Sequence, residues 1–152
     1  MSTDLTLPNF LATSGLPRSG KSTIARKIYQ PMGYTVVNPD QFRLTMFGQR
    51  YFAPGEPALW ATIYHVVDAL LASGNKVILD ATCLNSERRA AWVRRGAEFV
   101  VVDTPYEECV RRAQAENDEY ILPIIRRMWV SREDIQDFEK VYTVHKWQSE
   151  KT

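Results

Sequence analysis

The sequence predicts an α/β fold in which a parallel β-sheet is sandwiched by α-helices. Two observations predict it: apolar runs of strand length alternate with helical segments along the chain, and acidic or small polar residues follow several of these runs. The chain has 152 residues and is 45% hydrophobic, which is enough for one domain with a sizeable core. No repeat, low-complexity tract or linker divides it, so we expect a single domain over residues 1–152.

The strands follow from clusters of apolar and β-branched residues. We expect them at residues 9–14, 34–38, 76–80 and 99–103. Ligands bind outside the carboxyl ends of the strands in such sheets, and the first turn, Asp40, Asp80 and Asp103 all fall at that edge. The sequence therefore predicts a site surrounded by carboxylates.

The helices follow from composition, spacing and end signals. We expect them at residues 22–30, 40–47, 57–72 and 86–96, and again from Tyr106 onward. Asp40 opens the second of these helices, and Ser86 caps the fourth. In the third, apolar residues recur at helical spacing, and Ser73-Gly74-Asn75 supplies a stop. The segment at 52–57 is rich in proline and glycine, which predicts a surface connection.

A run near the N-terminus fits the phosphate-binding loop pattern G-x-x-x-x-G-K-[ST]; it reads GLPRSGKST over residues 15–23. Its glycines let backbone N–H groups turn inward around phosphate oxygens, Lys21 can neutralise the β- and γ-phosphates, and the Ser22 hydroxyl can ligate Mg²⁺. The flanking strand and helix favour this interpretation over a chance Gly/Ser turn. We therefore expect ATP and Mg²⁺ as cofactors, with the nucleotide held by Gly15, Pro17, Ser19, Gly20, Lys21, Ser22 and Thr23.

Asp80 is the second candidate of the phosphate site, because it ends an apolar strand in the manner of a Walker B carboxylate. Such a carboxylate holds Mg²⁺ or its water shell, so Ser22 and Asp80 form the expected metal pair. The alternative is that Asp80 only caps the loop at a strand end.

Asp40 and Arg43 form the pair that points to phosphoryl transfer onto a hydroxyl. Their i, i+3 spacing places both on one face of a helix, where a carboxylate base and a cation for an acceptor phosphate can share a pocket. The alternative is a helix N-cap with an exposed ion-pair partner, and spacing alone does not choose between the two.

These blocks resemble the kinase domain of phage T4-type polynucleotide kinase. They stand in the same order and at matching separations: residues 15–23, DQFR at 40–43 and DATCLNSERR at 80–89. The resemblance continues through residues 103–107 and 123–128, so it covers most of the chain. The phosphate loop is shared by many families, whereas the later blocks are more specific.

The resemblance implies a P-loop kinase fold with a helical lid at about residues 106–130. It implies transfer of the ATP γ-phosphate to a 5′-hydroxyl of DNA or RNA, with Asp40 as general base and Arg43 on the acceptor's phosphate. Asp80 belongs to the acceptor or metal shell, and lid arginines close over the transferring group. One well-placed arginine can contribute roughly a thousandfold to such a transfer.

The sequence departs from the family in two places. The phosphatase domain that often follows this kinase is absent from the sequence, so no end-healing phosphatase is expected. Where the family has an essential lid arginine, this chain reads AQAEN at 113–117. We expect Arg112 to serve in both catalysis and nucleotide binding, with Arg126 and Arg127 as alternatives and a solvated helix face as the non-catalytic interpretation.

Three functions are compatible with these observations. The first is a 5′-hydroxyl polynucleotide kinase, with DNA or RNA as partner. The second is a kinase for another hydroxyl, such as a hydroxymethylated base in phage DNA, a small metabolite, an antibiotic or a nucleotide sugar. The third is a non-enzymatic nucleotide-binding module, which the complete set of Lys21, Ser22 and Asp80 disfavours.

Composition limits the remaining possibilities. The formal charge of +1 gives no global field for nucleic acid, so an anion site must be a local cluster of arginines. Cys83 and Cys109 are far apart and form no zinc pattern, which leaves them as buried small residues. The absence of a signal or membrane-spanning run predicts a cytoplasmic protein, in the host cytoplasm if it is phage-encoded.

Several apolar and aromatic residues have structural roles as the main expectation. We expect all four tryptophans to pack in the core or between helices, and Tyr51 and Phe52 either to stack on an acceptor base or to anchor a loop. The amphipathic C-terminal stretch is expected to pack on the domain or to serve an oligomer contact, and the oligomeric state stays open; its apolar residues are Ile135, Phe138, Val141, Tyr142 and Val144.

Overall fold

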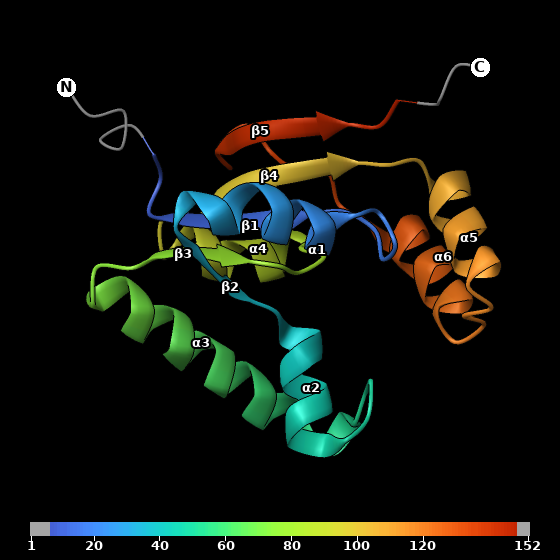
Figure 1. The fold of residues 1–152 in the computed structure, drawn as a ribbon, viewed down its shortest axis with the longest axis horizontal. Coiled ribbons are helices and arrows are strands. Elements are labelled where there is room, and N and C mark those ends of the chain that lie inside the picture. Colours follow the sequence, from blue (N-terminus) through green and yellow to red (C-terminus); the bar gives the residue numbers. More distant parts are fainter. Residues whose placement is uncertain (1–6, 149–152) are drawn as a thin grey trace.

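Five parallel strands form the centre of the computed structural model, which describes residues 7–148 (Figure 1). They lie in the order β2-β3-β1-β4-β5, and every neighbouring pair is parallel. The strands are β1 (Phe10–Ser14), β2 (Tyr34–Val37), β3 (Lys76–Leu79), β4 (Glu98–Asp103) and β5 (Val141–Lys146). The predicted α/β fold is confirmed, and the four expected strands are present to within a residue at each end.

The fifth strand was not predicted. β5 pairs with β4 at the edge of the sheet, within the stretch that the sequence presents as amphipathic. Ile135 and Tyr142 pack against the core as expected. Phe138, Val141 and Val144 are exposed, so they do not pack on the domain, and an oligomer contact for them stays a prediction. An edge strand has a neighbour on one side only, and this leaves part of its side chains in contact with solvent.

The helices cover both faces of the sheet and one of its ends. α1 (Lys21–Ile24) runs on as a π-helical segment (Ala25–Tyr29) and a 3₁₀ turn (Gln30–Met32), which together form the helix expected after the phosphate loop. The expected surface connection contains a 3₁₀ turn (Ala53–Gly55). The other helices are α2 (Pro39–Phe47), α3 (Glu56–Ala72), α4 (Ser86–Val93), α5 (Tyr106–Ala115) and α6 (Ile121–Ser131).

Two helices are capped by residues other than Ser86, which the sequence assigned to α4, and Asp40, for which a cap was the alternative role. Asn38, not Asp40, caps α2: its side-chain oxygen accepts from the Gln41 N–H at 3.1 Å. Asn85, not Ser86, caps α4 by accepting from the Arg88 N–H at 2.7 Å. Both asparagines have extended backbone at the cap, the conformation that lets a short side chain reach the first free N–H groups. The Asp40 carboxylate is therefore not used as a cap.

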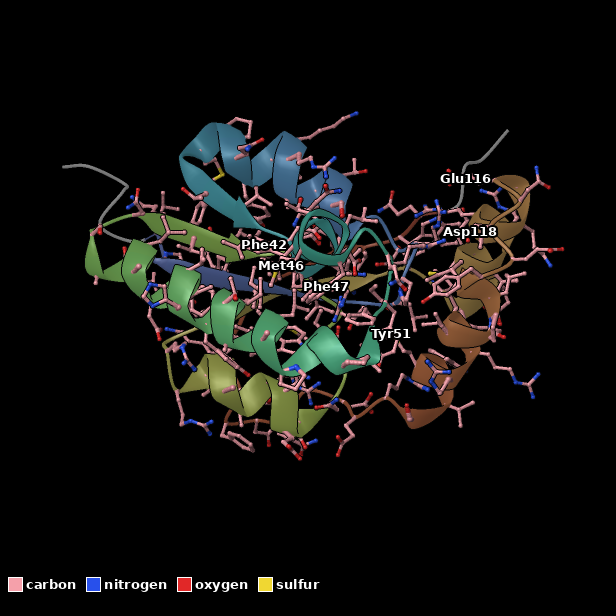
Figure 2. All side chains as sticks on the ribbon, turned by 90° about the horizontal axis from the view of Figure 1, so that it is seen from below. Phe42, Met46, Phe47, Tyr51, Glu116 and Asp118 are labelled. Carbon is pink, nitrogen blue, oxygen red and sulfur yellow. The ribbon has the colours of Figure 1, made fainter. Side chains whose placement is uncertain are left out.

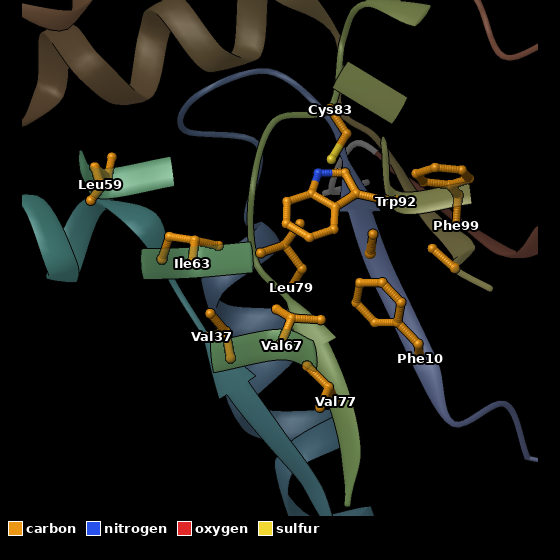
Figure 3. Packing of buried hydrophobic residues seen from close by; sticks show 12 residues of the cluster. Phe10, Val37, Leu59, Ile63, Val67, Val77, Leu79, Cys83, Trp92 and Phe99 are labelled. Carbon is orange, nitrogen blue, oxygen red and sulfur yellow. The ribbon is translucent and has the colours of Figure 1, made fainter. Parts of the chain in front are cut away.

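Apolar side chains on the two faces of the sheet form separate cores. On one face α3 and α4 pack against β1, β3 and β4, with the fully buried Trp92 at the centre (Figure 3). On the other face Ala25 and Tyr29 of the helix after the phosphate loop pack against Leu11, Ile78 and Val100. Successive side chains of a strand point to opposite faces of the sheet, and helices cover both faces. The strands are therefore nearly continuous apolar runs.

The four tryptophans do not share one environment. Trp92 is buried and Trp60 packs against the same core, as expected. Trp129 is 37% exposed, but its ring packs on Tyr106 of α5 with ring centroids 5.7 Å apart, so the expected packing between helices is confirmed for it. Trp147 is 36% exposed and follows β5, so the expectation was wrong for this residue. Trp129 lies on α6, and Trp147 lies directly after β5. Fewer elements surround a large side chain at these two places, which leaves part of each ring exposed.

A third apolar cluster joins α5 and α6 to the phosphate loop. Leu16 of the loop packs with Cys109 and Ala113 of α5 and with Ile125 of α6. This contact holds the helix pair beside the carboxyl ends of β1 and β4 (Figure 1). Within residues 7–148, no helix has the length and apolar character needed to cross a membrane.

Candidate active site

The loop over residues 15–23 has the backbone geometry of a phosphate cradle. At Gly15 a Cβ atom would stand 2.9 Å from both the Ser19 Oγ and the Val102 carbonyl oxygen, so only glycine fits. Gly20 has φ +103°, a conformation that glycine adopts without strain. The loop is held by hydrogen bonds from the Gly15 N–H to the Thr82 carbonyl at 3.0 Å and from the Thr104 hydroxyl to the Ser19 carbonyl at 2.8 Å.

The remaining predicted nucleotide ligands lie along this loop. Pro17 is partly buried in its turn and Ser19 is buried, while Thr23 is exposed in the first turn of α1. Lys21 is buried, and its Nζ donates to the Leu16 carbonyl at 2.7 Å. Burial lowers the pKa of the Lys21 amine, and the nearby Asp80 carboxylate opposes that effect. The loop therefore brings a cation and several backbone donors to one point.

Asp80 stands directly beside Ser22, as the metal prediction requires. The Ser22 hydroxyl donates to Asp80 Oδ2 at 2.6 Å, and Asn38 Nδ2 donates to the same oxygen at 2.8 Å. Asp80 is only 5% exposed, so these two donors fix its carboxylate. Mg²⁺ commonly uses one or two protein oxygens together with substrate phosphates, and the Ser22–Asp80 pair fits that donor set.

No cluster of three or more His, Cys, Asp or Glu side chains converges anywhere in the described part of the chain. The fit to Mg²⁺ is therefore to a shared protein–phosphate site and not to an all-protein cage. Asn38 was missed by the sequence analysis; an asparagine directly before a proline at a helix start is the signal that could have identified it as a cap beside this site.

Asp40 and Arg43 lie together, as their spacing predicts. Arg43 Nη1 donates to Asp40 Oδ1 at 2.8 Å, and the Asp40 side chain is 80% exposed. The Asp40 charge is one of the smaller influences that oppose the lowering of the Lys21 pKa by burial. Glu56, which the sequence analysis missed, binds Arg43 through both carboxylate oxygens at 2.9 Å. The Glu56 hydrogen bonds and charge raise the pKa of Arg43 further.

Among the arginines considered for the lid, the structure brings Arg112 to the phosphate loop. Arg112 Nη1 donates to the Arg18 carbonyl at 3.1 Å, and its Nε pairs with Glu108 at 2.9 Å. Its Nη1 also lies 3.6 Å from the position of a Cβ at Gly20. Arg126 and Arg127 are exposed on α6. Of the three, Arg112 is the one positioned to meet a phosphate in the loop.

A second group of ion pairs fastens the segment between α5 and α6 to the rest of the site. Asp118 accepts from Arg18 of the phosphate loop at 2.6 Å and from Arg50 at 2.9 Å, and Glu116 also pairs with Arg18. Figure 2 shows Asp118 and Glu116 at the end of the molecule that carries α5 and α6. Arg50 and then Arg18 hold the pKa of the Asp118 carboxyl well below its usual range. We call the three residues Arg18, Arg50 and Asp118 the clasp, and the sequence analysis did not foresee it.

The aromatic residues beside the clasp divide between the two roles considered for them. Phe52 packs on Phe47, with ring centroids 5.3 Å apart, so it anchors the connection to α3. Phe47 in turn lies against Gly55, where any Cβ would overlap its ring. Tyr51 remains 54% exposed on the side of the clasp (Figure 2). Phe52 is itself 37% exposed, so both rings present surface to a ligand and Tyr51 presents more of it.

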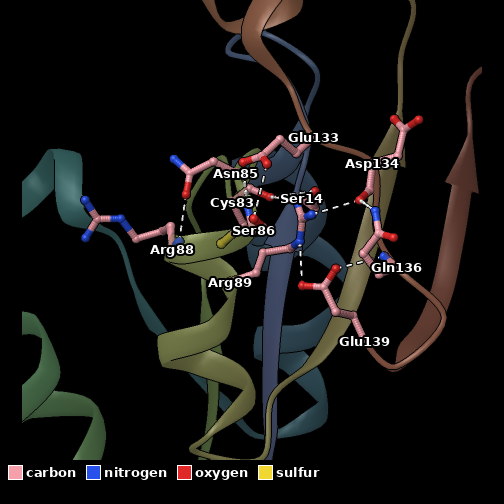
Figure 4. Close-up of polar contacts among 10 residues, drawn as sticks. All are labelled: Ser14, Cys83, Asn85, Ser86, Arg88, Arg89, Glu133, Asp134, Gln136 and Glu139. Atoms are coloured by element: carbon pink, nitrogen blue, oxygen red, sulfur yellow. Dashed lines mark hydrogen bonds and ion pairs between the residues drawn. The ribbon is translucent and has the colours of Figure 1, made fainter.

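A buried ion pair supports the loop that follows β3. Arg89 is fully buried, and its Nε donates to Glu139 at 2.8 Å. The same guanidinium donates to the carbonyl oxygens of Cys83 at 3.1 Å and Asp134 at 3.0 Å (Figure 4). Because every side of the charge is bonded, α4 and the chain before β5 are locked around residues 80–86. Arg89 is thus structural, although it belongs to the block that resembles polynucleotide kinase.

Two hollows open near the loop. One of about 610 Å³ is lined by Glu108, Arg111, Arg112, Trp147 and Gln148, and it adjoins the lid arginine and the end of β5. The other, of about 640 Å³, lies between the start of the phosphate loop and the chain before β5. Lys21, Ser22, Asp40 and Asp80 line neither hollow, so neither is the reaction centre. The smaller one presents Trp147 together with charged and polar side chains from α5 and the end of the described chain.

One protein-family model matches most of the chain. The model of an AAA domain, AAA_33, matches residues 11–144, which include the phosphate loop, Asp40, Asp80 and the helix pair. A curated relative, the shikimate kinase of Corynebacterium glutamicum, is 32% identical over 113 residues, which are 71% of this chain and 66% of the relative.

Solved structures give the same fold. A chain of a Pnkp1/Rnl/Hen1 complex is 35% identical with a TM-score of 0.61. The match covers 69% of the present chain and 38% of the chain in that complex. A chain of the Pnkp1/Rnl/Hen1 RNA repair complex is 28% identical with a TM-score of 0.63. The match covers 83% of the present chain and 46% of the chain in that complex. The present chain spans less than two thirds of each of these three relatives.

Proposed function

The chain belongs to the AAA_33 family of AAA domains and has the P-loop kinase fold, and on that premise we propose that it transfers the γ-phosphate of ATP to the 5′-hydroxyl of DNA or RNA. The observation that carries the proposal is the meeting of two pairs at one edge of the sheet. Ser22 bonds to Asp80 at 2.6 Å, and Arg43 bonds to Asp40 at 2.8 Å beside the loop. The first pair suits a nucleotide and its metal, and the second suits a hydroxyl acceptor.

The nucleotide half of the proposal rests on the phosphate loop. P-loop kinases use ATP and typically Mg²⁺, which neutralises charge on the β- and γ-phosphates when it is bound. In this chain the loop backbone and Lys21 bind the phosphates, and Ser22 and Asp80 hold the metal. Arg112 stabilises the charge that develops on the transferring group.

The acceptor half rests on Asp40. Its carboxylate is not engaged as a helix cap, and it is 80% exposed, so an incoming hydroxyl can reach it. It accepts the proton of the attacking hydroxyl, while Arg43 holds the carboxylate in place. We assign the moving part of this site to the lid at about residues 106–130, within a single domain that spans residues 1–152.

Two observations favour a nucleic-acid acceptor. The blocks DQFR and DATCLNSERR are those that resemble polynucleotide kinase of the T4 type. The chain is also 35% and 28% identical to chains of Pnkp1/Rnl/Hen1 complexes, one of which is described as an RNA repair complex. Those chains are more than twice as long as the matched part. The activity of the complexes is therefore only proposed for the present chain.

A second candidate acceptor is a small hydroxy compound. The 32% identity with a shikimate kinase favours it, since that relative matches over 71% of the chain. Under this alternative the nucleotide half is unchanged, and the site around Asp40 and Arg43 takes a small anionic alcohol. A non-enzymatic nucleotide-binding module would need Asp40 to be only a helix cap. It is disfavoured because Asp40 is exposed and does not cap α2.

The test is a transfer assay with γ-labelled ATP, Mg²⁺ and a panel of acceptors. The panel contains 5′-hydroxyl DNA and RNA oligonucleotides, the same strands with blocked 5′ ends, a hydroxymethyluracil-containing duplex with blocked ends, and shikimate. Label on the 5′ ends supports the proposal. Label on shikimate or on an internal base identifies that compound as the acceptor and contradicts the proposal. ATP binding with no label on any acceptor favours the non-enzymatic binding module.

A further inference from the structure

The cation that the resemblance assigns to the acceptor's phosphate is already neutralised. Arg43 is bonded by Glu56 through Nε and Nη2 and by Asp40 through Nη1, and its side chain is only 15% exposed. Two carboxylates therefore surround one guanidinium. An acceptor phosphate at Arg43 would meet the charge of Glu56 and Asp40 as well as that of the arginine.

A different arginine contacts the same tryptophan as Arg43, and within residues 7–148 no carboxylate lies at ion-pair distance from it. The Arg88 guanidinium stands 3.9 Å from the centre of the Trp60 ring, and Arg43 stands 5.7 Å from the centre of the same ring. Within residues 7–148 the Arg88 side chain makes no hydrogen bond or ion pair, whereas its neighbour Arg89 is bonded on every side. Figure 4 shows Arg88 pointing away from the Arg89 network.

Trp60 gives this arginine a fixed position. The indole N–H donates to Glu56 at 3.2 Å, which orients the ring in the first turn of α3. An arginine stacked on an indole keeps its N–H groups directed outward in the plane of the guanidinium, because the ring face occupies the side above or below that plane. Planar N–H pairs of this kind match the oxygens of a phosphate.

We propose that Arg88, held against Trp60, binds the first phosphodiester of the acceptor strand, and that Arg43 acts as a positioning residue for Asp40. The inference rests on the proposed function and deepens it, because it assigns the anion-binding group of the acceptor site. It reverses the role that sequence resemblance gives to Arg43. Glu56 keeps Arg43 in place, and Arg88 supplies a positive charge that no carboxylate binds directly, although the Glu56 charge acts on it through space.

The test removes the charge from each partner in turn. The acceptors are two 5′-hydroxyl oligonucleotides that differ only at the first linkage, which is a phosphodiester in one and an uncharged methylphosphonate in the other. Transfer from ATP is measured as kcat/KM for the wild type, Arg88→Gln and Arg43→Gln. Arg94→Gln, an exposed arginine directly after α4, is the matched control.

The wild type is expected to prefer the charged linkage about tenfold or more, the range for one hydrogen-bonded charge pair. Arg88→Gln is expected to lose this preference by slowing only the phosphodiester strand. Arg43→Gln is expected to slow both strands by the same factor. Trp60→Leu, which removes the stacking surface, is expected to reduce the preference in part, and Arg94→Gln to leave it unchanged.

The possible failures are distinguishable. A preference that persists in Arg88→Gln but disappears in Arg43→Gln overturns the inference and returns the phosphate to Arg43. Absence of transfer to either strand by the wild type, with ATP binding intact, overturns the proposed function and the inference with it. Thermal unfolding of each variant checks that the fold is retained; a variant that has unfolded is replaced by Arg88→Lys, which keeps the charge but loses the planar fork and is expected to retain part of the preference.

Discussion

The Ser22 hydroxyl donates a 2.6 Å hydrogen bond to Asp80 Oδ2 across 58 residues of sequence. The bond joins the start of α1 to the end of β3, and Asn38 at the end of β2 donates to the same oxygen. Parallel strands bring their carboxyl ends to one edge, so three separate segments meet at a single carboxylate. The arrangement makes the metal prediction directly testable.

Asp80→Asn is expected to raise the Mg²⁺ concentration that gives half-maximal transfer by about tenfold to a hundredfold. The amide cannot supply the negative charge that the ion requires. Initial rates over a Mg²⁺ titration measure the shift, and Thr62→Ala on the exposed face of α3 serves as the control. An unchanged titration in Asp80→Asn would remove this carboxylate from the metal site.

Lys21→Met is expected to lower kcat at least about a hundredfold, since it removes a preorganised cation from the transferring phosphate. The methionine has similar length and an apolar character that suits this buried position. Single-turnover transfer measures the effect, and the far-ultraviolet spectrum confirms that the fold is kept. Activity within a factor of three of the wild type would contradict the assignment.

Asp40→Asn is expected to lower the transfer rate by about 10²- to 10⁴-fold, the range for a lost general base. Binding of a fluorescent ATP analogue is expected to stay unchanged, because Asp40 is not a phosphate ligand in the proposal. Asp68→Asn is a suitable control: its carboxylate is also exposed and also pairs with an arginine, Arg95. Full activity in Asp40→Asn would exclude its role as base.

Asp118→Asn is expected to destabilise the protein by about 1 kcal/mol at pH 7, because the clasp loses its shared carboxylate. Arg50 and Arg18 lower the pKa of this carboxyl, so the stabilisation is present above the unfolded-state pKa of about 4 and is lost as the pH falls further. Urea unfolding at pH 7 and at acid pH measures it. The neighbouring Glu119→Gln is the control, and equal stability of Asp118→Asn and wild type at pH 7 would contradict the prediction.

The two cysteines are expected to be unreactive in the folded protein. Burial raises the pKa of the Cys83 thiol to about 12 and that of Cys109 to about 11, so neither is a thiolate at pH 8. A disulfide reagent should label fewer than one thiol in the native protein over an hour and both thiols in urea. Rapid labelling of Cys109 under native conditions would show that α5 and α6 open away from the phosphate loop.

The sequence was most informative where function constrains local geometry. The glycine spacing at Gly15 and Gly20, with Lys21 and Ser22 after it, predicts the loop because a close backbone approach to phosphate excludes other residues. The i, i+3 spacing predicts the contact between Asp40 and Arg43 because helix geometry fixes it. Both predictions depend only on neighbours along the chain.

The sequence was less informative at positions whose partners are distant. The clasp joins residues 18, 50 and 118, and no local pattern connects these positions. β5 was missed because an edge strand with one exposed side has a pattern that resembles an amphipathic segment. The cap of α4 was misassigned by one position, and the sequence left the cap as an alternative for Asp40, since Asn, Asp and Ser all satisfy a cap and only backbone conformation selects among them.

The sequence by itself determined the fold class, the phosphate loop and the placing of Asp40 and Asp80 at the ends of strands. These follow from periodicity and from motifs within about ten residues, where covalent geometry limits the alternatives. Tertiary structure alone decided which charges are compensated: Glu56 occupies Arg43, Glu139 occupies Arg89, and Arg88 is left against Trp60. The availability of a charge depends on which carboxylates the fold brings within hydrogen-bonding distance, and for these pairs that is set by packing between elements far apart in the chain.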